Sequence, residues 1–258
     1  MTDEPFSPEE ITDPTYVSPV FSTASRLVWT MLWCMQGMAN LIEIYDADDP
    51  TKPAAVVLAD FGSESNVQLQ ASGKNGTAPP VETIIQIIEK RGFLIDAIIV
   101  SHQDYDHWSL LSDLLYELRN PDWKPDDPIS DKYKLKTGYL FLGGVSWEPK
   151  ATFALKQVSD TVEELSIQFE EYYSSYHDSK NISESFLSYG NIEFKMLAVN
   201  GPNPETNSRA VESPKNASSA VVVVEWKNGC FILPGDATYQ TLETINPILN
   251  NWITKFEN

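Results

Sequence analysis

Residues 95–118 decide the fold: they read Ile95-Asp-Ala-Ile-Ile-Val100, then Ser101-His102-Gln103-Asp104-Tyr105-Asp106-His107, then an apolar helical pattern from Trp108 to Leu118. The short apolar run predicts a buried strand, and the apolar spacing after the loop predicts a helix. In α/β folds, a polar loop between a strand and a helix lies at the carboxyl end of the strand, where binding sites form. We therefore expect a functional site within residues 101–107.

Two of the three histidines in the chain lie in this loop, and two aspartates lie between them. Imidazole and carboxylate groups are ligands that suit Zn²⁺ and Mn²⁺. On an extended loop, residues 102, 104 and 106 can point to one side, while residue 107 turns at the start of the helix. The spacing therefore predicts a metal site with His102, Asp104, Asp106 and His107 as ligands.

A simpler explanation is that Asp104 and Asp106 cap the following helix while the two histidines pack nearby. This explanation would suit a single histidine and a single aspartate. Two carboxylates held close together without a cation would cost several kcal/mol in repulsion and lost solvation. Four donors at this spacing therefore favour a metal.

Asp236 is the fifth expected ligand. It follows an apolar strand and the dipeptide Pro234-Gly235, and glycine lets the backbone turn sharply at a strand end. A Gly-Asp pair alone is a common turn and carries little information. Together with the loop at residues 101–107, Asp236 is expected to bridge two metal ions.

The loop resembles the signature of the metallo-β-lactamase superfamily, His-x-His-x-Asp-His after a strand, with a bridging aspartate later in the chain. Residues 101–107 match, position by position, the variant Ser-His-x-Asp-x-Asp-His. That variant is common in the soluble β-lactamase-like domain of ComEC-type DNA-uptake proteins and in its stand-alone relatives. Asp104 in place of the second histidine is therefore what this subgroup leads us to expect.

Further segments resemble the same subgroup and occur in the same order. They are Gln36-Gly37 with Asn40-Leu-Ile, Ala59-Asp60-Phe-Gly62, and Asn216-Ala-Ser-Ser219-Ala-Val-Val leading to Leu233-Pro-Gly-Asp236-Ala. Near the first of these segments, Met35 and Met38 depart from the pattern. The resemblance spans about residues 26–240. It implies that Asp60 orients the metal-binding loop without contacting the metal itself.

The resemblance implies an α/β (α+β) protein with the αββα sandwich of the superfamily: two mixed β-sheets face to face, flanked by helices, with metals at one edge. It implies a metallohydrolase, in which bound metals lower the pKa of a water molecule so that hydroxide attacks a phosphorus or carbonyl centre. His102 and Asp104 would hold one Zn²⁺ or Mn²⁺, and Asp106 and His107 the other, with Asp236 between them. Asp106 is also the candidate catalytic residue.

Among substrates, the resemblance favours a phosphodiester in a nucleic acid or a nucleotide, and it leaves lactam and thioester hydrolysis open. The superfamily places a further histidine ligand after the Gly-Asp strand, whereas this chain has no histidine after His177, which we expect to be exposed. Either the sequence is part of a longer chain or the second metal site is incomplete. The alternative function is therefore a binding or regulatory module without catalytic activity.

The chain of 258 residues carries 18 Lys and Arg against 37 Asp and Glu, a formal net charge of −19. Such a surface repels phosphate backbones and anionic lipids, which argues against membranes and long nucleic-acid tracks. A small phosphodiester or a locally basic groove would avoid this repulsion. The acidic residues 163–171 and the acidic N-terminal arm are either solvated or dock a basic protein partner.

Cys34 and Cys230 are expected to be buried small apolar residues, because each lies in an apolar run and neither belongs to a Cys-x-x-Cys pair. Unpaired cysteines suit a reducing compartment. The N-terminus is acidic, unlike a signal peptide, and no apolar stretch approaches the about 18 residues of a membrane span. We therefore expect a soluble cytoplasmic protein.

We divide the chain into an acidic, proline-bearing arm at residues 1–24 and a metallo-β-lactamase-like domain at residues 25–258. Strands are predicted at residues 27–35, 39–44, 54–59, 95–100, 138–144, 192–199, 219–226 and 229–234. Helices are predicted at residues 81–90, 108–118, 160–176 and 239–256, the last interrupted by Pro247, and loops at residues 63–80 and 119–134.

Overall fold

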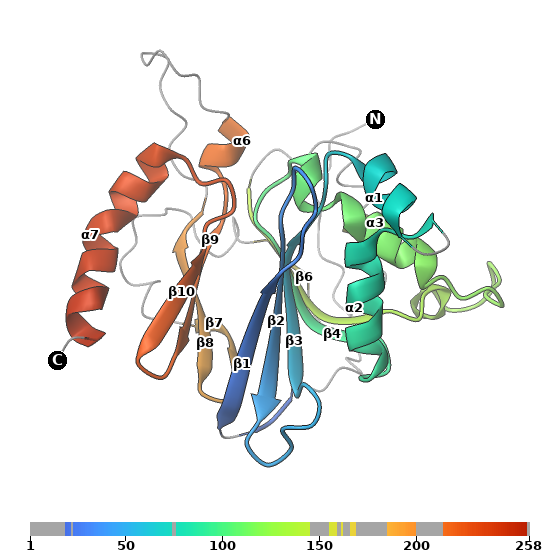
Figure 1. Ribbon diagram of the computed structural model, residues 1–258, viewed down its shortest axis with the longest axis horizontal. Coiled ribbons are helices and arrows are strands. Elements are labelled where there is room, and N and C mark those ends of the chain that lie inside the picture. Colours follow the sequence, from blue (N-terminus) through green and yellow to red (C-terminus); the bar gives the residue numbers. More distant parts are fainter. Residues whose placement is uncertain are drawn as a thin grey trace.

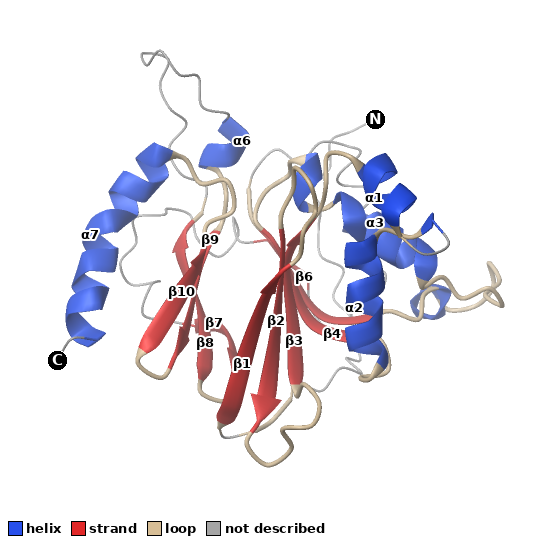
Figure 2. Cartoon of the chain, viewed as in Figure 1, coloured by secondary structure: helices blue, strands red, loops and turns tan. Residues whose placement is uncertain are grey.

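The computed structural model describes residues 19–21, 23–73, 76–144, 155–158, 161, 166–168, 185–199 and 214–256. Two β-sheets pack face to face, and helices cover the outer face of each sheet (Figures 1 and 2). The predicted αββα arrangement is therefore confirmed. The division into an arm at residues 1–24 and a domain stays a prediction, because residues 1–18 lie outside the described part of the chain.

The first sheet has six strands in the order β1-β2-β3-β4-β5-β6. In chain order these are Ala24–Met31, Ala39–Asp46, Ala55–Phe61, Leu94–Val100, Lys136–Leu142 and Ser166–Gln168. The first three strands form the predicted antiparallel meander, and the last three run parallel to β3. The carboxyl ends of β3, β4 and β5 therefore lie at one edge of the sheet.

The second sheet has four strands in the order β10-β9-β8-β7. In chain order these are β7 (Ser185–Tyr189), β8 (Ile192–Ala198), β9 (Val221–Trp226) and β10 (Gly229–Leu233). All three pairings are antiparallel, where the resemblance implied a mixed sheet. Tight connections join β7 to β8 and β9 to β10, and such hairpins need no crossover helix.

Helices cover the two outer faces. Four α-helices in the described residues have seven or more residues: α1 (Asn66–Ser72), α2 (Pro79–Glu89), α3 (Ser109–Glu117) and α7 (Tyr239–Phe256). Shorter helical segments are α6 (Pro214–Ala217), η2 (Tyr105–His107) and η3 (Ile129–Lys132). Figure 1 shows α1, α2 and α3 on the outer side of the six-stranded sheet and α7 on the outer side of the four-stranded sheet. No helix in the described residues is long and apolar enough to cross a bilayer.

Three apolar layers hold these elements together. On β3, Ala55, Val57 and Ala59 pack towards the second sheet, whereas Val56 and Leu58 pack towards the helices. This alternation is the two-residue period of a strand with both faces buried. A third, smaller layer lies between α7 and the four-stranded sheet.

The structure departs from the predicted loop at residues 63–80, because α1 begins there at Asn66. Leu69 of α1 is fully buried in the apolar layer beneath the helices. Burying this side chain favours a helical turn although the surrounding composition is typical of a loop. Further along, α7 continues across Pro247, where we expected an interruption.

The predicted helix at residues 160–176 is wrong at Ser166–Gln168, which form β6. These residues pair in parallel with β5, with Ser166 opposite Leu140. Hydrogen bonds to the open edge of β5 outweigh the helical spacing of acidic and apolar residues. Most of the remaining residues of that segment, and His177, lie outside the described residues.

The two cysteines differ. Cys34 is buried as predicted, but Cys230 is exposed, so the prediction for Cys230 is wrong. Cys230 lies on β10, an edge strand of the four-stranded sheet. An apolar run predicts a strand, but it does not reveal which strand ends at the edge of a sheet, where side chains meet solvent.

Candidate metal centre

The loop at residues 101–107 lies at the edge of the sandwich, where β3, β4 and β5 end. It follows β4 directly, and its last three residues form η2, which leads into α3. In the parallel pairing of β3 and β4, Ala59 lies beside Ile99, so Asp60 and the start of the loop emerge side by side. The alignment of two parallel strands therefore places Asp60 behind the loop.

Asp60 holds the loop through both of its carboxylate oxygens. Its Oδ1 accepts a hydrogen bond of 2.7 Å from the backbone N–H of Ser101, and its Oδ2 lies 3.1 Å from His107 Nδ1. Asp60 is 5% exposed and has a positive φ of 49°. A residue other than glycine rarely adopts this conformation without a compensating contact. Contacts of this kind, to the loop backbone and to His107, are what Asp60 needs for the proposed role of orienting the loop.

The end of β3 packs directly against the loop at Gly62. A Cβ atom at this position would overlap the backbone of Asp106 and His107. The segment before β2 also holds the loop, because the N–H of Met38 donates to the carbonyl of Asp106 over 3.2 Å. The backbone of η2 is thus held from two neighbouring strands.

Asp236 comes to the site from the second sheet, through the turn after β10. Gly235 in this turn has a φ of +53°, and a Cβ atom there would lie 2.7 Å from Ser101 Oγ. The N–H of Ala220, just before β9, donates to the carbonyl of Ser101 over 2.9 Å. The absence of a side chain at Gly235 allows the two sheets to meet at Ser101, beside the two histidines.

Three donors converge most closely: the ligand atoms of His102, His107 and Asp236 all lie within 4.8 Å of one another. Asp236 Oδ1 lies 3.3 Å from His107 Nε2, and the imidazole centroids of the two histidines lie 4.1 Å apart. Both histidines are fully buried. Buried polar atoms normally have partners, yet within the described residues neither Nε2 atom makes a hydrogen bond. A cation between these atoms would satisfy them.

Asp104 and Asp106 lie at the rim, each beside the histidine with which it was paired. Asp104 Oδ2 lies 3.5 Å from His102 Nε2, and Asp106 Oδ2 lies 3.9 Å from His107 Nε2. Their side chains are 29% and 23% exposed, respectively. All five predicted ligands therefore gather at one edge. The ligand atoms of His102, His107 and Asp236 lie closest together, although the Asp236 side chain, at 37%, is the most exposed of the five.

Burial and the charged groups of the site shift the pKa values of the two histidines in opposite directions. Burial lowers the pKa of His107, but the nearby carboxylates of Asp60 and Asp236 outweigh burial and raise this pKa to about 10. Burial and the neighbouring His107 lower the pKa of His102, and His107 also lowers the pKa of Asp236. A proton on His107 therefore neutralises the carboxylates, and a metal would have to displace it.

The sequence analysis did not single out Ser101. Its hydroxyl lies 3.1 Å from His102 Nδ1 and 3.2 Å from His107 Nδ1, between the two rings. Its position directly before the first ligand is the signal that could have identified it. Ser101 and Asp60 together contact the Nδ1 side of the imidazoles and leave the Nε2 atoms facing the site.

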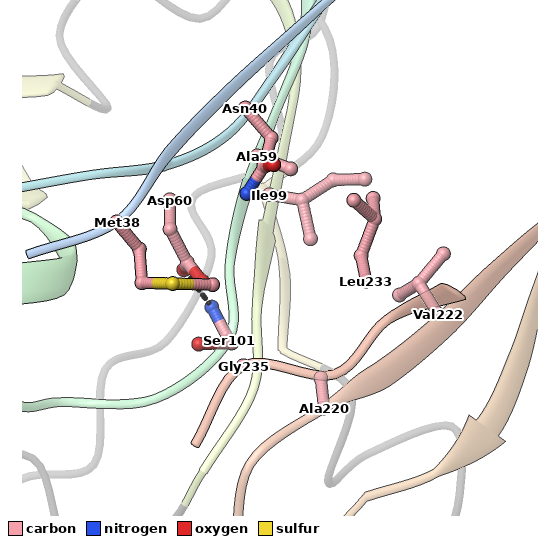
Figure 3. Close-up of a pocket in the computed structure, with 10 residues that line it drawn as sticks. All are labelled: Met38, Asn40, Ala59, Asp60, Ile99, Ser101, Ala220, Val222, Leu233 and Gly235. Carbon is pink, nitrogen blue, oxygen red and sulfur yellow. Dashed lines mark hydrogen bonds between the residues drawn. The ribbon is translucent and has the colours of Figure 1, made fainter. Parts of the chain in front are cut away.

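A small cavity lies beneath the site, between the two sheets (Figure 3). It is lined by Met38, Asn40, Ala59, Asp60, Ile99, Ser101, Ala220, Val222, Leu233 and Gly235. Its volume of about 10 Å³ is close to the smallest that holds one water molecule. Figure 3 shows the hydrogen bond from Ser101 to Asp60 at the end of this cavity. This cavity therefore has no room for a molecule much larger than water.

These features define an α+β sandwich with a histidine and aspartate cluster at one edge, suited to a metal ion. No protein-family model matches the sequence, and no curated protein matches it either. Among solved structures, the chain is similar to the metallo-β-lactamase fold protein YhfI from Bacillus subtilis, with a TM-score of 0.38 and 13% identity over 81% of this chain and 62% of that one.

The chain is also similar to CmlA, a diiron β-hydroxylase from Streptomyces venezuelae, with a TM-score of 0.37 and 13% identity. That match covers 83% of this chain and 30% of CmlA. The chain thus spans less than two thirds of the length of either protein. A likeness at this level does not establish a family.

Proposed function

We propose that this protein is a metal-dependent hydrolase of the metallo-β-lactamase type, holding two Zn²⁺ ions, or Mn²⁺ in their place, and acting on a phosphodiester. The observation that carries the proposal is the pair of buried Nε2 atoms of His102 and His107, which make no hydrogen bond within the described residues. They face Asp236 and lie beside two rim carboxylates. Neutral imidazole and ionised carboxylate together form the donor set that zinc prefers.

In this proposal His102 and Asp104 hold one metal, Asp106 and His107 hold the other, and Asp236 lies between them. When bound, a metal pair lowers the pKa of water towards about 7 and neutralises charge on the attacked group. The loop spacing of residues 102–107 supports this assignment, because each aspartate lies beside its paired histidine.

The chain's own residues prepare the site. Asp60 Oδ2 accepts the Nδ1 proton of His107, which leaves the Nε2 lone pair directed at the site. Asp106 is the proposed catalytic residue as well as a ligand, because its carboxylate lies at the rim, 3.9 Å from His107 Nε2. Ser101 hydrogen bonds on the Nδ1 side of both rings and limits their rotation.

The phosphodiester substrate rests on the resemblance of residues 101–107 and on charge. A formal net charge of −19 opposes a long nucleic-acid strand and favours a small substrate such as a nucleotide. The open rim of the centre, with only a water-sized cavity beneath it, suits a substrate whose reacting group alone enters the site.

The test is metal stoichiometry by elemental mass spectrometry on protein purified without chelator, combined with hydrolysis of bis(p-nitrophenyl) phosphate. We expect two metal ions per chain and turnover that chelator removes and Zn²⁺ or Mn²⁺ restores. As a matched control, Asp48→Asn changes an exposed carboxylate in the turn after β2 and should alter neither quantity. A chain that binds no metal under these conditions contradicts the proposal.

A second candidate is a metal-binding module without turnover. It is favoured by one observation: among the described residues, the one group of three or more whose ligand atoms all lie within 4.8 Å of one another is His102, His107 and Asp236. Three ligands are enough for one ion. One metal per chain without hydrolysis of any phosphodiester tested would select this second candidate.

A further inference from the structure

A second pocket lies away from the metal centre, at the end of α3 that is farther from His107. Among the described residues, its lining consists of Ser112, Leu115, Tyr116, Arg119, Lys132, Tyr133 and Gln157. They come from α3 and the residue that follows its last turn, from the end of η3, and from a helical turn at residues 155–158. Along α3, which starts at Ser109, the lining residues Ser112 to Tyr116 lie about 5 to 10 Å from the start of the helix.

The charged residues that line this pocket in the described part of the chain are both cations, Arg119 and Lys132, although the net charge of the chain is −19. Across the described part of the chain, neither side chain forms an ion pair with a carboxylate, whereas Arg91 and Lys195 do. Lys132 Nζ lies 5.1 Å from the centroid of the Tyr133 ring and 5.8 Å from that of Trp123. These contacts orient the ammonium group, and no described carboxylate pairs with it.

The backbone holds the two cations in place. Arg119 and Tyr133 form an isolated antiparallel bridge. The N–H of Asn120 donates to the carbonyl of Lys132 over 2.9 Å, and the N–H of Lys134 donates to the carbonyl of Leu118 over 2.8 Å. The segments that carry Arg119 and Lys132 are therefore bonded to each other, and both residues line the same pocket.

The remaining lining residues add an apolar floor and polar groups. Leu115 and Tyr133 are 2% and 6% exposed and form the floor, whereas Tyr116 is 75% exposed and stands at the rim. Ser112 and Gln157 supply a hydroxyl and an amide. The pocket volume of about 290 Å³ is at the lower end of the range for small-molecule sites.

The geometry points to a binding site for a small aromatic anion, whose phosphate or carboxylate group pairs with Arg119 and Lys132 while its ring packs against Leu115 and the two tyrosines. Arginine offers a planar fork that suits these anionic groups, and lysine adds a point charge. The site does not depend on the metal centre, so this inference stands apart from the proposed hydrolase function.

The test uses the full chain, freed of metal by chelator and dialysed, so that the metal centre does not bind the probe. Phenyl phosphate and benzoate are titrated separately by calorimetry and by NMR shifts of ¹⁵N-labelled protein, with phenol as the uncharged control. We expect saturable binding of at least one anion, with shifts at Arg119, Lys132 and Tyr116, and no saturable binding of phenol. The better of the two probes shows whether phosphate or carboxylate is preferred.

Variants locate the site. Arg119→Gln combined with Lys132→Gln should weaken binding by at least about tenfold, because each charge-assisted contact contributes substantially to affinity. Lys134→Gln, an exposed cation on the same segment that does not line the pocket, should leave affinity unchanged. Circular dichroism and thermal melting should show that all variants fold.

Two results would overturn the inference. One is the lack of saturable binding of either anion by the folded wild-type chain. The other is an anion affinity that the double variant retains, or that falls instead in the metal-centre variant His102→Gln. The single variant Arg119→Gln provides the same comparison if the double variant does not fold, because Arg119 is exposed.

Discussion

The two sheets contribute unequally to the candidate metal centre. The six-stranded sheet carries His102, Asp104, Asp106 and His107 on one loop, together with Asp60 behind them, whereas the four-stranded sheet adds only Asp236. Residues on one loop are close because the chain connects them, but Asp236 is close only because the two sheets pack. The comparison shows that one half of the site is built locally and the other half depends on the whole sandwich.

The largest expected effect comes from the local half. His107→Ala removes a central ligand and leaves Asp60 and Asp236 without their common partner. Metal affinity should fall by more than the about 100-fold that changes behind a ligand can cause. The metal content, measured by elemental mass spectrometry, and the melting temperature should fall together, because bound metal stabilises the native state.

Asp236→Ala, the corresponding change in the other half, is the comparison variant. We expect a smaller loss than in His107→Ala, since the loop ligands remain. Equal metal loss in the two variants would break the distinction between a local and a long-range half.

The glycines that join each half to the loop offer a second comparison. At Gly62 an added Cβ atom would overlap the backbone of Asp106 and His107. At Gly235 an added Cβ atom would contact the side chain of Ser101, and the φ of +53° is unfavourable for any residue with a side chain. Gly62→Ala should destabilise by about 3 kcal/mol, and Gly235→Ala by about 1–2 kcal/mol. Urea unfolding measures both, and Gly229→Ala, which meets only a carbonyl oxygen at 3.9 Å, is the control.

Asp60→Asn tests the positioning of the loop. The change keeps the shape of the side chain but removes the charge beside His107 Nδ1. Zinc affinity should fall by about 10- to 100-fold, as measured by competition with a chromophoric chelator, while folding persists. Unchanged affinity would remove Asp60 from the site.

A rise in pH should lower the stability of the metal-free protein and increase the affinity of the protein for metal. The folded pKa of His107 is raised to about 10 from about 6.5 in an unfolded chain. Its contribution to the stability of metal-free protein is therefore complete below pH 6.5 and disappears as pH rises through 10. Metal affinity should rise over the same range, because a ligand must lose its proton.

Unfolding with and without Zn²⁺ from pH 6 to 10 measures both trends. In His107→Gln the falling trend of the metal-free protein should flatten. A metal-free protein that instead becomes more stable through this range would contradict the ion pairs assigned to His107.

The smallest effect is expected at the rim. Asp104→Asn changes a side chain that is 29% exposed and lies 3.5 Å from His102 Nε2. Metal affinity should fall by less than about tenfold, since Asp104 is not one of the three residues whose ligand atoms lie within 4.8 Å of one another. Calorimetric titration with Zn²⁺ measures the change, and a loss as large as that in His107→Ala would place Asp104 among the central ligands.

The elements predicted most reliably from sequence were those with strong periodic patterns. The meander of β1 to β3, the strand before the loop, and helices α2 and α3 were all recognised. Ser166–Gln168 and Leu69 were misjudged, because a neighbouring sheet edge and a buried layer decided their conformation. A local sequence pattern does not show which distant part of the chain will pair with a segment or pack against it.

By itself the sequence determined the loop: two histidines and two aspartates within six residues, after a buried strand and before a helix, have few arrangements other than a cluster of donors at a sheet edge. Only the tertiary structure decided that Asp236 reaches His107, that Ser101 lies between both imidazoles, and that Arg119 and Lys132 line one pocket. The physical reason is range. Covalent connection brings neighbours together at little entropic cost, whereas distant residues meet only when packed apolar layers compensate for closing the chain between them.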